Sequence, residues 1–306
     1  MINLRRYTSD FMQKHGFPAD AQNDLLAALD AICESENTKN RFSALIDEYN
    51  ENIKCNYPGM LKDAIDLGHE VGIHEYTVSL LLYVCLSKRL GEVYAERGID
   101  ESIFFDSVHD LYYKLIECRL VYGINGSFVA PWFSGFYNLT RFGLGRLQFE
   151  ILATREDVAI GGTLYPTGTK ALAVHIPRTG TKLEHESVLE SYRLASEFFC
   201  SEFEGQPILF RCHSWMLDPW LKAVLAPTSN ILAFAKDYLF VNTNECEINN
   251  VVWRVFDQEY KGDPYALSQS STIRRAYVQR IACSDSLTEA LGFFLYKGGN
   301  IINTAI

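Results

Sequence analysis

Residues 170–199 read KALAVHIPRTGTKLEHESVLESYRLASEFF and decide the fold of the chain. The apolar run ALAVHI at 171–176 predicts a short strand that ends at Pro177. The polar loop RTGTK at 178–182 follows, and behind it a helix is predicted over 183–199. This helix is indicated by apolar side chains that recur at helical spacing and would face a sheet, namely Val188, Tyr192, Ala195 and Phe199. A strand, a loop and a helix in this order are typical of an α/β domain.

The loop at 178–182 also predicts an anion site. A helix N-terminus leaves several backbone N–H groups without partners and carries the positive end of the helix dipole. A loop that offers Gly, Thr, Arg and Lys at that point can cradle a phosphate. Thr181 and Glu184 have the spacing of a capping box, which favours a helix start here. The alternative is an ordinary turn, which any α/β protein needs between a strand and a helix.

Length and composition narrow the class of protein. A chain of 306 residues exceeds the usual size of one core, so two domains are expected. The 48% hydrophobic and 22% charged residues are typical of a soluble globular protein, and no apolar run approaches the roughly 18 to 20 residues of a membrane span. The N-terminal segment MINLRRYTSDFMQ lacks the apolar core of a signal peptide, so we expect a cytoplasmic location and no membrane partner.

Charge and cysteine usage exclude further classes. The formal net charge of −10 disfavours non-specific binding to nucleic acid, although one locally basic loop can still bind a small anion. The 8 cysteines are scattered and form no C-x-x-C, which indicates reduced thiols rather than a disulfide framework or a zinc site. His69-Glu70 and His74 miss the spacing of a zinc-protease motif, so no metal site is predicted.

The first part of the chain is predicted to be helical. Apolar residues recur at helical period through most of it, and a bundle of antiparallel helices joined by short loops is expected. The predicted helices cover 20–34, 41–53, 60–67, 74–97 and 103–122. A glycine-punctuated junction follows over 123–145, and its aromatic side chains are expected to be buried.

The second part predicts a mixed α/β domain, because strand-like and helix-like segments alternate along it. The predicted strands are 146–154, 171–176, 208–213 and 251–256. The predicted helices are 183–199, pieces at 220–225 and 231–238, and a terminal helix from about Ser271.

Two side chains on these strands are candidates for acid–base chemistry. Glu150 is a carboxylate in the middle of an otherwise apolar strand, and burial there would raise its pKa toward the range of a general base at neutral pH. The alternative is an ion pair with Arg146 or with an arginine elsewhere. His175 ends the strand before the anion loop, where ligands approach an open α/β sheet, so it is a base, a hydrogen-bond donor or a core histidine.

Ser214, at the end of the next predicted strand, is a third candidate site residue. Cys212 and His213 cannot act as nucleophile and base, because neighbouring strand residues point to opposite faces. Cys212 and Ser214 share a face and could both line a site, whereas the alternative makes Cys212 a buried structural residue.

Four motifs in order carry a resemblance to a known family. They are LGRLQFE at 144–150, His175-Ile176-Pro177 followed by a glycine, Ser214-Trp215 with Leu217-Asp218-Pro219, and Ser229-Asn230-Ile231 with Phe234. This succession resembles bacterial acyltransferase-domain proteins, which join an all-helical N-terminal domain to a C-terminal domain like the GNAT N-acetyltransferases. The resemblance implies an α+β chain with a helical domain over 1–140 and a GNAT-like mixed α/β domain over 141–306. It also implies acetyl- or acyl-coenzyme A as co-substrate.

The implied activity is transfer of the acyl group to an amine on a small molecule or peptide. Glu150 or His175 would serve as the base, directly or through water, and Ser214 or Tyr238 as the acid. The residues expected to hold the coenzyme are Ile176, Arg178, Thr179, Gly180, Thr181 and Lys182, with Ser229 and Asn230 either capping a helix or reaching the pantetheine arm. The family's pyrophosphate loop is [QR]-x-x-G-x-[GA], and the loop here has one glycine. The alternative is therefore a catalytically inactive ligand-binding or interaction module.

Overall fold

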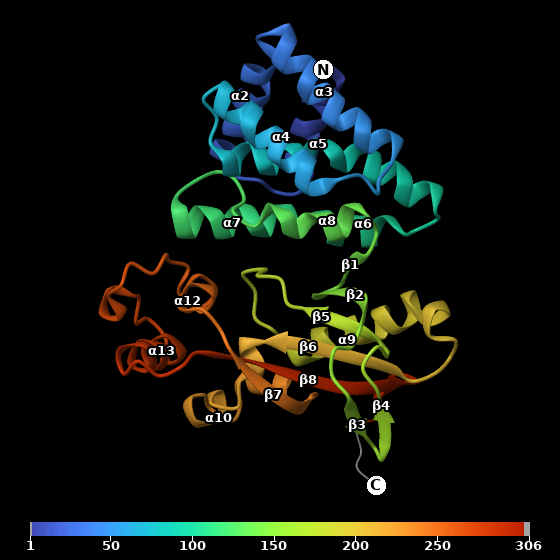
Figure 1. Ribbon diagram of the computed structural model, residues 1–306, viewed down its shortest axis with the longest axis vertical. Coiled ribbons are helices and arrows are strands. Elements are labelled where there is room, and N and C mark those ends of the chain that lie inside the picture. The colour runs from blue at the N-terminus through green and yellow to red at the C-terminus, as the bar shows by residue number, and fades with distance from the viewer. Residues whose placement is uncertain (1, 303–306) are drawn as a thin grey trace. The chain divides into compact units, whose positions relative to one another are not determined.

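The computed structural model describes residues 2–302. The chain divides into two compact units, Met1–Gly143 and Leu144–Ile306 (Figure 1). The first unit is helical, and the second combines a sheet with helices. The predicted fold class, a helical part followed by a mixed α/β part, is confirmed.

The first unit is a bundle of helices. Its longer helices are α1 (Ile2–Lys14), α2 (Ala19–Cys33), α3 (Glu36–Glu51), α4 (Tyr57–Glu70), α5 (Glu75–Glu96), α6 (Glu101–Val108) and α7 (Asp110–Tyr122), followed by the short helices η1 (Ala130–Phe133) and α8 (Ser134–Tyr137). The single helix predicted over 103–122 is wrong in one respect, because the chain breaks at His109 into α6 and α7. Helix α3 begins before the predicted start, since the Ser35 hydroxyl accepts a hydrogen bond from the Thr38 N–H.

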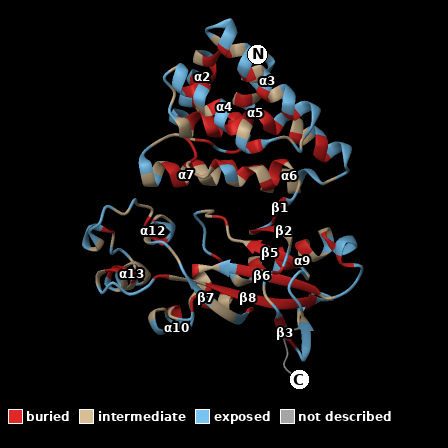
Figure 2. Ribbon diagram, viewed as in Figure 1, coloured by how far each residue is buried: buried red, intermediate tan, exposed pale blue. Residues whose placement is uncertain are grey.

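Helix α5 is the centre of this bundle. Every residue from Thr77 to Ser87 is buried, as the continuous red in the middle of α5 shows (Figure 2). A helix that is apolar all round must have neighbours on every side, and here they come from α1 to α4 and from α6 and α7. The Tyr137 hydroxyl donates to the Tyr83 carbonyl, and the Tyr49 hydroxyl donates to the Tyr137 carbonyl. The predicted burial of the junction's aromatic residues is confirmed for Phe133, Phe136 and Tyr137.

The second unit is built on one main sheet. Its strands are β2 (Leu147–Ala153), β5 (Lys170–His175), β6 (Ile208–Ser214), β8 (Thr288–Lys297) and β7 (Leu239–Glu245) in spatial order, with β9 (Asn300–Ile301) beside β8 and a separate hairpin of β3 (Val158–Ile160) and β4 (Thr163–Tyr165). β1 (Arg141–Leu144) spans the boundary between the units. β5 and β6 run parallel, and the other neighbours in this order are antiparallel. The parallel pair therefore lies in the middle of a mixed sheet.

Helices fill the connections of this unit. They are α9 (His185–Phe198), α10 (Leu221–Val224), α11 (Asn230–Ala235), α12 (Ile248–Phe256) and α13 (Thr272–Ala282), with single turns at η2 (Cys200–Phe203), η3 (Trp215–Leu217) and η4 (Pro264–Ala266). Helix α9 packs on one face of the sheet through Tyr192, whose ring lies 5.5 Å from that of Phe210 and 4.8 Å from that of Phe294. The other face is partly covered by Val158 and Ile160 of the hairpin.

Three predictions for this unit are wrong. The valine-rich segment 251–256 is no strand but part of α12, because its buried residues fall on one face of a helix, namely Val251, Val252, Val255 and Phe256. Helix α13 is not terminal, since the long strand β8 follows it. The capping box does not form, because α9 begins at His185 and its N-cap residue, Glu184, makes no side-chain cap bond. In addition, β7 begins at Leu239, directly behind the segment predicted as a helix over 231–238.

Across residues 2–302, no helix has the length and apolar character needed to cross a membrane. Over the same range, no three histidine, cysteine or acidic side chains gather into a possible metal site.

Candidate functional site

The structure brings Glu150 and His175 together on adjacent strands. In the antiparallel pair β2–β5, Gln148 lies opposite His175 and Glu150 lies opposite Ala173. The two candidate side chains are therefore diagonal neighbours on one face of the sheet. His175 Nε2 lies 3.7 Å from Glu150 Oε1, and the side chains are 27% and 22% exposed. A carboxylate beside a partly exposed imidazole can orient the ring and stabilise its protonated form.

The polar character of this face continues onto β6. Ala173 of β5 is in register with Arg211 of the parallel strand β6, so Arg211 projects from the same face as Glu150. His213, two residues further along, lies 3.7 Å from Glu289 Oε2 through its Nδ1 atom. Its Nε2 atom lies 3.4 Å from the Asn244 side-chain nitrogen. Arg211, Glu289 and Asn244 were not among the predicted site residues.

A sequence signal for Arg211 existed. Strand β6 reads ILFRCHS, in which buried Phe210 and Cys212 alternate with Arg211 and His213. This alternation with a period of two marks a strand with one apolar and one polar face. Glu150 is paired with Ala173, and Ala173 with Arg211. This register could not be predicted, because it depends on strand pairing between distant segments.

The predicted acid candidates lie on the opposite face of the sheet. Ser214 pairs with Ala290 of β8, and its hydroxyl accepts a hydrogen bond from the Met216 N–H at 3.2 Å. The Tyr238 hydroxyl lies 3.0 Å from that of Tyr192 on α9, and burial raises its pKa well above the usual value. Burial also raises the pKa of the Cys212 thiol to about 12, which suits a structural cysteine. The structure thus does not bring Ser214 to the face of Glu150 and His175.

The loop after β5 is fixed by an ion pair. Arg178 lies 2.6 Å from Asp257 at the end of α12, and the same carboxylate lies 2.7 Å from Arg274 of α13. The hydroxyls of Thr179 and Thr181 lie 2.8 Å apart, and both threonines lie in the segment of the predicted anion site. The other predicted loop residues are partly exposed Ile176 and exposed Gly180 and Lys182.

The start of α9 carries acidic residues. Glu184 holds the N-cap position, and Glu186 lies in the first turn, where carboxylates interact favourably with the helix dipole. His185 Nε2 lies 3.0 Å from both carboxylate oxygens of Asp237, which is 8% exposed. Burial raises the pKa of Asp237. The helix terminus is thus already supplied with negative charge by the chain itself.

Ser229 and Asn230 begin helix α11. Ser229 takes the N-cap position with extended backbone, but its side chain makes no cap hydrogen bond. Asn230 is the first residue of the helix, and both side chains are partly exposed.

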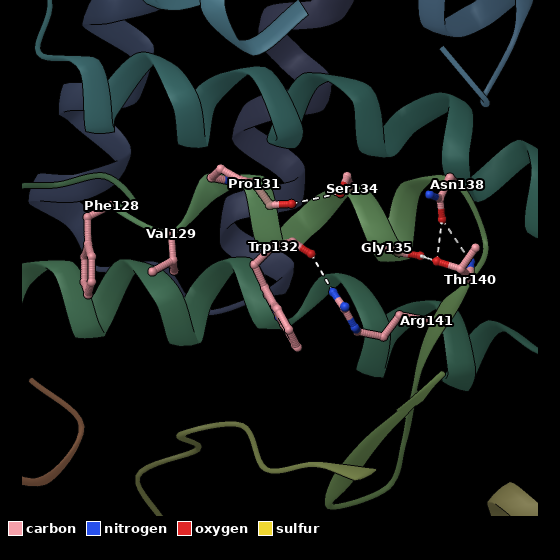
Figure 3. Close-up of a pocket in the computed structure, with 9 residues that line it drawn as sticks. All are labelled: Phe128, Val129, Pro131, Trp132, Ser134, Gly135, Asn138, Thr140 and Arg141. Carbon is pink, nitrogen blue, oxygen red and sulfur yellow. Dashed lines mark hydrogen bonds between the residues drawn. The ribbon is translucent and has the colours of Figure 1, made fainter. Parts of the chain in front are cut away.

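The helical unit contains a pocket of its own. It has a volume of about 570 Å³ and includes Phe128, Pro131, Trp132 and Arg141 among its walls (Figure 3). The Arg141 guanidinium lies 3.4 Å from the centre of the Trp132 ring and donates to the Trp132 carbonyl at 2.7 Å. Gly135 allows this packing, since a Cβ there would lie 2.6 Å from an Arg141 nitrogen. None of the predicted site residues lines this pocket.

Solved structures of acyltransferases share this fold. One acyltransferase in complex with decanoyl-CoA and teicoplanin is 21% identical, with a TM-score of 0.72 over 94% of this chain and 86% of that chain. An acyltransferase mutant in complex with octanoyl-CoA is 20% identical, with a TM-score of 0.71 over 93% of this chain and 86% of that chain. A third acyltransferase, in complex with CoA and 10C-teicoplanin, is 20% identical, with a TM-score of 0.61 over 94% of this chain and 98% of that chain.

Family comparison covers both units. No curated protein matches the sequence. The family described as N-acyltransferase N-terminal domain matches residues 7–139, and the family described as GNAT-like C-terminal domain matches residues 141–294. The chain therefore belongs to the acyltransferases that carry an N-acyltransferase N-terminal domain and a GNAT-like C-terminal domain.

Proposed function

We propose that this protein transfers an acyl group from acyl-coenzyme A to an amine. The observation that carries the proposal is the contact of 3.7 Å between His175 Nε2 and Glu150 Oε1. Glu150 lies on β2 and His175 on β5, and β5 also pairs in parallel with β6. The fold around this pair of residues is shared with acyltransferases that were solved in complex with decanoyl-CoA and octanoyl-CoA.

The Glu150–His175 pair suits the role of the base. The neutral amine attacks the thioester carbonyl, a C–N bond forms, and the C–S bond breaks. The proton lost by the amine passes to His175 or Glu150, directly or through one water, and the coenzyme thiolate leaves and takes up a proton. Glu150 lies where it stabilises the imidazolium that forms if His175 accepts the proton.

The role of the acid at the leaving thiolate is assigned to Ser214 or Tyr238. Burial raises the pKa of Tyr238 well above its usual value, so its hydroxyl stays protonated and would stabilise the leaving thiolate as a hydrogen-bond donor rather than by giving up its proton. Ser214 lies at the end of β6, one of the two strands of the parallel pair. β5 and β6 are paired at Leu172–Phe210 and at Ala173–Arg211. Each strand then continues, β5 to His175 and β6 to Ser214, beyond these paired residues. We propose that the thioester lies at these strand ends, where both faces of the sheet are accessible.

The coenzyme phosphates are assigned to the loop between β5 and α9. The proposed contacts come from Ile176, Arg178, Thr179, Gly180, Thr181 and Lys182, with Ser229 and Asn230 toward the pantetheine arm. Gly180 has a φ of +78°, a conformation that suits glycine. Lys182 is exposed and makes no ion pair with any described residue, so its ammonium is available to a phosphate. Arg178 is held by Asp257, so in addition to its proposed phosphate contact it fixes the loop.

The acceptor is proposed to be an amine on a small molecule or a peptide. One acyltransferase of similar fold was solved in complex with teicoplanin. A cytosolic location and a bacterial source remain predictions from the sequence.

A thermal-shift titration tests coenzyme binding. Acetyl-CoA and decanoyl-CoA are added separately up to about 1 mM, and the Tm is expected to rise with concentration because a ligand of the folded state stabilises it. A Tm that neither compound raises would contradict the proposal. Thiol release from the bound acyl-CoA in the presence of a panel of amines then tests catalysis. Binding without amine-dependent release would favour the alternative, a catalytically inactive ligand-binding module.

A further inference from the structure

We infer that the acceptor carries a carboxylate close to its amine, and that Arg211 binds this carboxylate. The acceptor would then be an amino acid or a peptide that presents its amine and a carboxylate together. This inference rests on the proposed acyl transfer, and it names the class of acceptor.

Arg211 lacks the ion pair that several other arginines of its unit make. Its Nε atom is buried and has no hydrogen-bond partner, and no carboxylate of residues 2–302 lies within ion-pair distance of its guanidinium. Other arginines of the unit are paired: Arg178 and Arg274 with Asp257, and Arg280 with Asp218. A buried donor on a charged group is unfavourable without a partner. Arg211 is therefore built to meet an anion that the chain itself does not supply.

The position of Arg211 matches the proposed chemistry. Glu150, Ala173 and Arg211 form one row across three neighbouring strands. Neighbouring strands are about 4.8 Å apart, so the backbones of Glu150 and Arg211 are separated by about 10 Å. Only the methyl group of Ala173 projects between them. A carboxylate on Arg211 would hold the attached amine beside Glu150 and His175.

The phosphates of the coenzyme are a less suitable partner for Arg211. Helix α9 packs against Phe210 and Phe294, which point to the opposite face of the sheet from Arg211. The loop to which the phosphates are assigned leads into that helix. The coenzyme phosphates and the Arg211 guanidinium are therefore separated by the sheet.

A second buried polar atom lies on the face of Arg211. Asn242 of β7 pairs with Leu291 of β8, which in turn pairs with His213 of β6, so Asn242 and Arg211 share this face. Asn242 Oδ1 is buried and has no hydrogen-bond partner within residues 2–302. It accepts a hydrogen bond, whereas Arg211 donates. The two atoms suit a polar acceptor with a peptide-like or amide N–H in addition to its carboxylate.

The test compares acceptors that differ only at the carboxylate. Thiol release from acetyl-CoA and decanoyl-CoA is measured with the common amino acids, with simple dipeptides and with the carboxamide of each. The amine of a carboxamide is the weaker base and more of it is neutral, so a preference for the carboxylate cannot come from amine reactivity. We expect the wild-type protein to prefer at least one carboxylate over its carboxamide by about 30-fold in kcat/KM, the size of a charge-assisted hydrogen bond.

Variants locate this preference. Arg211→Gln should raise the KM for the carboxylate acceptor by about 30-fold and leave the KM for acyl-CoA and the rate with the carboxamide unchanged. Arg211→Lys should restore part of the preference, because the charge returns without the two-pronged geometry. Arg193→Gln is the matched control, since Arg193 lies on α9 in surface ion pairs with Glu190 and Glu197.

Several outcomes overturn the inference while acyl transfer stands. These are release with carboxylate-free amines alone, equal rates with a carboxylate and its carboxamide, and an Arg211→Gln variant whose KM rises for acyl-CoA instead. If Arg211→Gln does not fold, the wild-type comparison and Arg211→Lys still decide. Failure of acyl-CoA to bind at all would instead overturn the proposed function itself.

Discussion

Two histidines in different units show how the surroundings decide what one side chain can do. His15, directly after α1, is 2% exposed and lies among Phe11 and Phe105, with its Nδ1 atom 3.1 Å from His109 Nδ1. Burial, followed by the charge of His109, lowers the pKa of His15 to about 3. His175 is 27% exposed and faces a carboxylate instead. The first histidine is held neutral inside a core, whereas the second keeps part of its ring exposed beside a carboxylate.

The largest expected effect is on activity. His175→Ala should reduce kcat for amine-dependent thiol release by at least about 10²-fold, because it removes one of the two proposed bases and the partner of the other. Glu150→Gln should have a smaller effect in the same direction, and the Tm of both variants should stay close to that of the wild type. Glu190→Gln, on the exposed side of α9, is the control. An unchanged kcat in both site variants would show that the base lies elsewhere.

The matching change in the helical unit should affect stability instead. His15→Ala removes a buried ring and its contact with His109, so the free energy of unfolding should fall by about 2 kcal/mol. Urea denaturation measures this loss. The kcat of the folded variant should equal that of the wild type, and a loss of kcat without a loss of stability would place His15 in the chemistry.

The helical unit should also become less stable in acid. The pKa of His15 is about 3 in the folded state against 6.5 ordinarily, so between these values the unfolded chain binds a proton that the folded chain does not. Stability is therefore full above pH 6.5 and falls as the pH drops toward 3, by up to about 1.4 kcal/mol per pH unit. Urea midpoints at pH 7.5 and pH 5 measure the slope, and His15→Phe should flatten it. A midpoint that does not move would contradict the low pKa.

The smallest expected effect is the contribution of His109, beside His15, to the loss of stability in acid. His109→Gln keeps a hydrogen-bonding side chain beside His15 but removes a second group whose pKa burial lowers. The loss of stability between pH 7.5 and pH 5 should shrink by less than about 1 kcal/mol. The pH 7.5 midpoint, measured on the same samples, is the reference. An acid loss larger than in the wild type would contradict this account.

The sequence predicted local elements better than the site. The strand at 171–176 and the helix behind it follow from local periodicity, and both are confirmed within a few residues. The contact of Glu150 with His175 depends on the β2–β5 register, which no local pattern contains. Strand β8 was missed because TEALGFFLYK is apolar on both faces and shows no alternation.

At α12, by contrast, a strand was predicted where the chain forms a helix. A run of β-branched residues at 251–256 favours a strand, but the chain forms a helix that buries the same residues on one side. Burial within the cluster around Tyr277 and Trp215 outweighs the intrinsic preference of valine. The candidate roles of Ser214 and of the loop at 178–182 remain predictions.

The paired arginines at Asp257 have a consequence for how this protein can diverge. Asp257 contacts Arg178 in the loop after β5 and Arg274 in α13 at the same time. The conformation of the loop is thus set in part by a segment that follows it far along the chain. Grafting residues 178–182 alone into a relative would leave their anchor behind. Conversely, substitutions in α12 or α13 can retune the loop while its own sequence stays constant.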